Sequence, residues 1–138
     1  MNCVLITIRS GLPAVSESPL AEHIDTIERA YEYLLAYAAQ GRQEDAGTEA
    51  RTMLEQMHVA LGAVGGLAQA AFAACTAQSG VADYLTAVEL DAKVARGAVG
   101  LVLSREHIGS LLVDNLNASV HLRAVLTDVF LLEQALKT

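Results

Sequence analysis

The chain has few aromatic residues and few positive charges. Tryptophan is absent, and the 138 residues include only two Phe and four Tyr. Nine Lys and Arg stand against 16 Asp and Glu, which gives a formal net charge of -7 at pH 7. An acidic field of this size repels phosphate backbones and anionic lipid headgroups. We therefore expect no nucleic acid among the direct partners of the protein.

Cysteine is also scarce. Cys3 and Cys75 lie far apart in the sequence and form no CxxC pair, which is not the framework of a small secreted disulfide domain. We expect both thiols to be reduced. The apolar run from Cys3 to Ile8 has no basic region before it and is too short for a signal peptide. These features predict a cytoplasmic location, and seven Arg against two Lys are typical of high-GC bacterial coding.

The longest stretch without a charged residue spans residues 56–82. Within it, most of residues 59–77 are Ala or Gly, which gain little free energy from lipid compared with Leu, Ile or Phe. We expect a helix that is packed by other helices on several sides, and no membrane span.

Apolar residues recur at alternating spacings of three and four along most of the chain, which is the period of an amphipathic helix. Ser18 followed by Pro19 is typical of a helix start, and Gly41 is typical of a helix end. The pattern predicts four helices near residues 19–40, 48–78, 80–103 and 105–137. Short connections make consecutive helices antiparallel, so residues 19–138 are predicted to form an all-α, up-down-up-down four-helix bundle. Residues 1–18 are predicted to be an extended N-terminal segment that covers one end of the bundle or pairs with a second copy.

The sequence carries none of the common catalytic or phosphate-binding motifs. GxSxG, GxxxxGK[ST] and a GxGxxG after a strand are all missing, and neither cysteine has a histidine close by in sequence. We therefore expect no enzyme activity. The prediction is a non-enzymatic, protein-binding helical bundle, such as an adaptor, a chaperone or a regulatory subunit, with no cofactor.

The third and fourth predicted helices each have a second apolar face in addition to the one that a bundle buries. A small bundle cannot cover such faces by itself, so we expect them to contact a second copy or another protein. The predicted interface, most simply that of a homodimer, consists of Leu90, Val94, Leu101, Val113, Leu116, Val120 and Leu131.

A metal site is the main alternative function. Glu55 and His58 have the ExxH spacing that places a carboxylate and an imidazole on one face of a helix, as in di-iron bundles. Antiparallel helices would bring Glu28 and His107 to about the same level. These four residues are the predicted ligands of a di-iron-like or single-metal site.

Two further alternatives concern the same helix. The stretch from His58 to Gly62 resembles the phosphorylated helix of histidine phosphotransfer domains, which implies phosphoryl transfer at His58. That family has a Lys where Leu61 stands, so the cation that would neutralise the phosphoryl group is missing. The other alternative is an apolar-ligand carrier in which Gly62 and Gly66 line a cavity.

Overall fold

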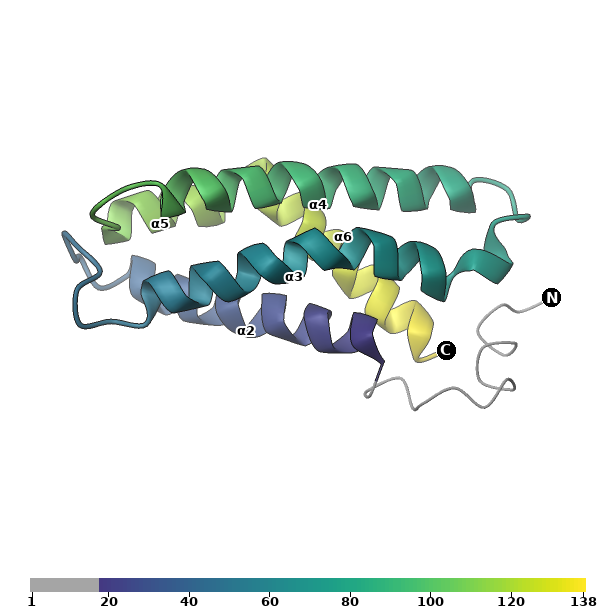
Figure 1. Ribbon diagram of the computed structural model, residues 1–138, viewed down its shortest axis with the longest axis horizontal. Helices are drawn as coiled ribbons and strands as arrows, with labels where there is room; N and C mark the ends of the chain where they lie inside the picture. Colours follow the sequence, from purple (N-terminus) through teal and green to yellow (C-terminus); the bar gives the residue numbers. More distant parts are fainter. Residues whose placement is uncertain (1–17) are drawn as a thin grey trace.

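A computed structural model describes residues 18–138 of the chain (Figure 1). All secondary structure in this part is helical and it contains no strand, so the all-α prediction is confirmed for it. The elements are α2 (Pro19–Ala38), α3 (Ala50–Ala71), a short 3₁₀ helix η2 (Ala73–Cys75), α4 (Val81–Leu103), α5 (Ser110–Ala118) and α6 (Val120–Leu136). The predicted extended segment falls on residues outside the described part, apart from Ser18.

Helix α2 begins where the sequence predicts. The Ser18 side chain accepts a hydrogen bond from the Ala21 N–H at 3.1 Å, and Pro19 occupies the first helical position. Leu20, Ile24 and Ile27 then point inward at spacings of four and three, and all three are fully buried or nearly so. The local signals and the core-facing stripe therefore agree.

Helix α3 lies between α2 and α4 and packs closely on both (Figure 1). Helices α5 and α6 together close the remaining side: α5 packs mainly on α2, whereas α6 packs mainly on α4. The buried residues of all these helices form one apolar core. Within residues 18–138, no helix is both long and apolar enough to cross a membrane.

The structure has two helices where the sequence predicts one over residues 105–137. The break lies at Ser119, whose ψ of 130° is extended rather than helical. Its side chain accepts a hydrogen bond from the His121 N–H at 3.2 Å and so caps α6. Near this break, the buried side-chain amide of Asn117 donates a hydrogen bond to the Leu34 carbonyl oxygen of α2 at 3.1 Å. The described chain thus has five α-helices in place of the predicted four.

The second predicted helix, at residues 48–78, is also shorter than expected. Helix α3 ends at Ala71, and the chain continues through η2 to Cys75. Cys75 is buried and disulfide-bonded, so the expectation of a reduced thiol is wrong at this position. Cys3, the other cysteine of the chain, lies outside the described residues.

Candidate functional site

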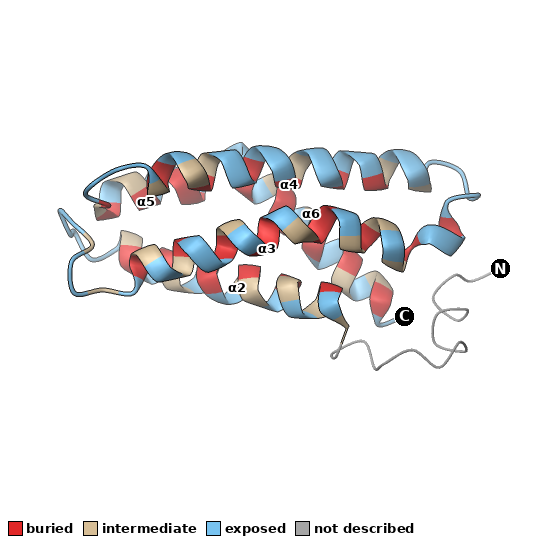
Figure 2. Cartoon of the chain, viewed as in Figure 1, coloured by how far each residue is buried: buried red, intermediate tan, exposed pale blue. Residues whose placement is uncertain are grey.

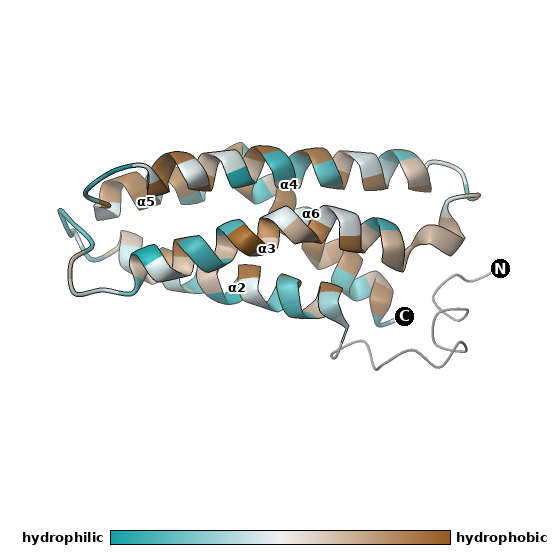
Figure 3. Cartoon of the chain, in the orientation of Figure 1, coloured by the Kyte–Doolittle hydropathy of each residue, from teal (hydrophilic) through white to brown (hydrophobic). Residues whose placement is uncertain are grey.

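The outer side of α4 carries an uninterrupted row of exposed small and apolar residues. We call this row the α4 stripe, and it consists of Ala87, Leu90, Val94, Gly97 and Leu101. Leu90, Val94 and Leu101 are 59%, 40% and 67% exposed. Figure 2 shows exposed residues along the length of α4, and Figure 3 shows apolar residues spaced along the same helix. The stripe is therefore apolar surface that the rest of the described chain leaves uncovered.

The other residues of the predicted interface lie on α5 and α6. Val113 and Leu116 are buried in the core of the chain itself, because α5 turns their side of the helix toward α2. They are therefore corrected from surface to core. Val120 and Leu131, both on α6, are exposed as an interface would require. Association through these surfaces stays a prediction.

The four predicted metal ligands are not brought together. Glu28 on α2 faces Glu133 on α6, and Glu55 is exposed on α3. His107 follows α4, with its Nδ1 atom 3.5 Å from a carboxylate oxygen of Glu44. In the described chain, no three His, Cys, Asp or Glu side chains are grouped so that they could hold a metal ion. The predicted common level of these residues is therefore not seen.

His58 and the glycines of α3 lie at or near the contact between α3 and α4. A Cβ atom at Gly100 would be 3.5 Å from His58 Nε2, so the imidazole packs against the backbone of α4. A Cβ atom at Gly62 would lie 3.2 Å from the side chain of Arg96. Gly62 and Gly66 are both exposed, which contradicts the expectation that they line a cavity inside the bundle.

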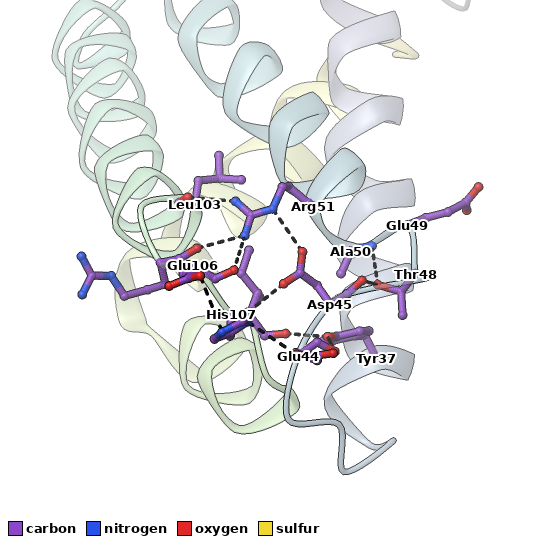
Figure 4. Close-up of polar contacts among 12 residues, drawn as sticks. Tyr37, Glu44, Asp45, Thr48, Glu49, Ala50, Arg51, Leu103, Glu106 and His107 are labelled. Atoms are coloured by element: carbon purple, nitrogen blue, oxygen red, sulfur yellow. Dashed lines mark hydrogen bonds and ion pairs between the residues drawn. The ribbon is translucent and has the colours of Figure 1, made fainter.

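A polar network joins the α2–α3 loop to the α4–α5 loop (Figure 4). We call it the loop clasp, and Asp45 and Arg51 form its centre. Asp45 accepts hydrogen bonds from the Ile108 N–H at 2.9 Å and from Arg51 Nε at 3.1 Å. The other guanidinium nitrogens of Arg51 donate to the carbonyl oxygens of Leu103 and Arg105, at 3.0 and 2.9 Å. Arg51 thereby satisfies the carbonyl group of the last residue of α4, which has no helical partner, and a carbonyl group of the loop that follows.

The loop clasp keeps Asp45 ionised. Burial by itself would raise the pKa of this carboxyl group, but the hydrogen bonds from Ile108 and Arg51 outweigh burial and lower it below its ordinary value. The second half of the network surrounds Tyr37, which is fully buried and donates its hydroxyl proton to the Ile108 carbonyl oxygen. Ser110 Oγ donates to the Tyr37 carbonyl oxygen at 2.7 Å and accepts from the Arg42 N–H at 2.9 Å. All these contacts are internal, so the loop clasp is a structural element.

Three ionisable side chains that sequence reasoning missed meet between α4 and α6. Tyr84 and Asp91, which are seven residues apart on α4, lie against Asp128 of α6. The Tyr84 hydroxyl donates to Asp128 Oδ1 at 3.4 Å, whereas Asp128 Oδ2 is buried and receives no hydrogen bond from residues 18–138. Burial and the neighbouring Asp91 raise the pKa of Asp128 to about 7. The seven-residue spacing is visible in the sequence, but the pairing with α6 depends on the tertiary fold.

A second carboxyl pair connects α2 to α6. Burial, and then the charge of Glu133, raises the pKa of Glu28 above its ordinary value. One oxygen of Glu28 is buried and has no donor in the described part of the chain. Lys137 lies 3.6 Å from Glu133 and partly offsets the repulsion.

Comparisons of the chain with models of protein families, with curated protein sequences and with solved structures gave no match. No relative therefore assigns a function to any of its residues.

Proposed function

We propose that this protein is a non-enzymatic binding module that associates with a second copy of itself through the α4 stripe. The observation that supports the proposal is the spacing of the stripe. Its five residues follow steps of three, four, three and four, which is the period of the seam between two packed helices. A seam of this kind fits another helix with the same spacing, and a second α4 presents one.

The sizes of the side chains favour an antiparallel arrangement of the two copies. A two-fold axis between Val94 and Gly97 would place Leu90 opposite Leu101 of the second copy. It would also place Val94 opposite Gly97 of the second copy, so that a branched side chain meets a residue without one. A Cβ atom at Gly97 would meet no atom within 4 Å, which leaves room for an incoming side chain. The arrangement therefore pairs valine with glycine at its centre and leucine with leucine on either side of the centre.

The chemistry of the stripe agrees with this assignment. None of its five residues is charged, although the chain has a net charge of -7. Association would remove Leu90, Val94 and Leu101 from water at about 25 cal/mol per Å² of apolar area. The acidic remainder of the surface favours solubility of the assembled form.

The test is sedimentation equilibrium at tens of micromolar protein. The wild type is expected to be a dimer, and Leu101→Glu is expected to be a monomer because two carboxylates would face apolar leucines. The matched control is Val59→Glu, which places the same charge at a position on α3 that is 66% exposed and outside the stripe. This variant is expected to remain a dimer. A monomeric wild type, or a dimeric Leu101→Glu that circular dichroism shows to be folded, would contradict the proposal.

A double variant tests the antiparallel arrangement. Leu90→Lys and Leu101→Glu would each be monomeric alone, but together they place Lys opposite Glu of the second copy at both ends of the seam. The double variant is expected to regain association, with a stronger dependence on salt than the wild type. In a parallel pair the same change would oppose like charges, so failure to regain association would exclude the antiparallel form.

A further inference from the structure

At the contact of α6 with α4, the side chain of Asp128 meets another carboxyl group and a tyrosine hydroxyl group, and one of its own oxygens is buried. Asp128 of α6 faces Asp91 and Tyr84 of α4, and these are the ionisable side chains that influence it. Asp128 Oδ2 is buried and has no donor among residues 18–138, and a neighbouring carboxyl group such as Asp91 can donate a hydrogen bond to it only when one of the two carries a proton. Such a proton would supply the partner that Asp128 Oδ2 otherwise does not have in this part of the chain.

The contacts of α6 with α2 and α5 do not offset the negative charge of Asp91 and Asp128. Toward α2, Glu133 of α6 faces Glu28, with Asp25 of α2 adding further negative charge. Lys137 is the cation of this contact and pairs with Glu133 at 3.6 Å. Toward α5, the connection is the extended residue Ser119, so α6 does not continue a preceding helix. Helix α6 contacts α4, α2 and α5, but less extensively than α3 contacts α2 and α4, so a local opening is expected to involve α6 before α3.

We propose that α6 is a pH-sensitive helix, which packs firmly on α4 when Asp91 and Asp128 share a proton and loosens when both carboxyl groups are ionised. Loosening would expose the inner face of α6, which includes Leu122, Val125 and Val129. The contact between α4 and α6 would thus couple the protonation of one carboxyl group to the exposure of core surface.

The direction of the pH dependence follows from the ionisation of Asp128. Its pKa is raised from 3.8 to about 7 when α6 is packed, because of burial and of Asp91. A carboxyl group whose pKa is raised by folding stabilises the folded state fully at pH values below its pKa in the unfolded chain. This stabilisation is lost as the pH rises to the pKa of the group in the folded chain. The packing of α6 is therefore expected to weaken between mildly acidic and neutral pH and to change little above about pH 8.

The test is amide hydrogen exchange at about pH 6 and about pH 8. After correction for the intrinsic exchange rate, protection of α6 amides in the wild type is expected to fall about tenfold over this interval, with a smaller change in α3. In Asp128→Asn the side-chain amide can donate to Asp91 at any pH, so this fall is expected to disappear. Asp114→Asn, at an exposed position of α5, is the matched control, and the fall in protection of the α6 amides is expected to remain in it.

A second measurement starts from the wild type, so its main result does not depend on whether Asp128→Asn folds. The carboxyl carbon of Asp128 in the wild type is expected to titrate in the NMR spectrum with a midpoint near 7. In Asp91→Asn that midpoint is expected to fall, because the like charge is gone. Equal protection of α6 at the two pH values, an unchanged fall in Asp128→Asn, or an Asp128 midpoint near its ordinary value of 3.8 would each overturn the proposal.

Discussion

Asp45 shows how one side chain can hold two loops together. Replacing it by Asn keeps an acceptor for the Ile108 N–H but removes the charge that pairs with Arg51 at 3.1 Å. Because the side chain of Asp45 is largely buried, we expect Asp45→Asn to lower the free energy of unfolding by about 1–3 kcal/mol in urea denaturation. Asp114→Asn, at an exposed position of α5, is the control and is expected to change it by less than about 0.5 kcal/mol. An Asp45 variant as stable as this control would show that the loop clasp is not needed.

Two adjacent glycines of α3 are expected to respond to alanine in opposite directions. A Cβ atom at Gly65 would lie 3.1 Å from the Glu89 Cα atom, so the backbones of α3 and α4 approach each other closely here. Gly65→Ala is therefore expected to lower the free energy of unfolding by about 1–3 kcal/mol. At Gly66 the added methyl group would meet no atom within 4 Å, so Gly66→Ala is expected to raise it by about 0.5–1 kcal/mol. Thermal denaturation of the two variants checks both signs, and equal effects would contradict the close approach at Gly65.

At the scale of single elements, the sequence predicts the helices that have one continuous apolar face and both end signals. Helix α2 is the clearest case, since its start at Pro19 agrees with the structure and its end at Ala38 is close to the predicted one. The single helix expected over residues 105–137 was wrong because apolar residues keep the helical spacing across the break. Spacing alone does not show that Ser119 caps a new helix, because the same residue type also occurs inside helices.

The break at Ser119 leads to a prediction about α6. Its hydroxyl group is the side-chain cap of this helix, through the 3.2 Å hydrogen bond from the His121 N–H. We expect Ser119→Ala to lower the free energy of unfolding by about 1 kcal/mol, and Ser119→Asp, which restores an acceptor, to recover most of that loss. Chemical denaturation of the three proteins is the measurement. If Ser119→Ala is as stable as the wild type, the side chain is not an effective cap.

At the scale of the whole molecule, the sequence indicates that apolar surface remains but not where all of it lies. Leu90, Val94 and Leu101 are predicted correctly as exposed, because α4 has a second apolar face that a bundle of this size leaves uncovered. Val113 and Leu116 look equivalent in the sequence, yet they are buried because this side of α5 packs on α2. The acidic contact around Asp128 was not predicted either, since it joins residues from two helices whose packing no local signal specifies.

The balance of buried carboxyl groups sets the pH at which the whole molecule is most stable. Asp45 has a lowered pKa, so its contribution is present above its ordinary value of 3.8 and is lost as the solution becomes more acidic. Asp128 and Glu28 have raised pKa values, so their contributions are complete at acidic pH and are lost as pH rises, for Asp128 up to about 7. The two groups of effects together favour a maximum of stability at mildly acidic pH.

We therefore expect the midpoint of urea unfolding, at one protein concentration, to be higher at about pH 5 than at about pH 8. Asp128→Asn is expected to reduce this difference, because its side chain does not ionise and its hydrogen bond to Asp91 persists. Asp45→Asn is expected to preserve the fall toward alkaline pH while lowering the midpoint at every pH above about 4, where the wild-type carboxylate is charged. A midpoint that is higher at pH 8 than at pH 5 would mean that the carboxyl pairs of α6 are outweighed by ordinary surface ion pairs such as Asp25 with Arg29.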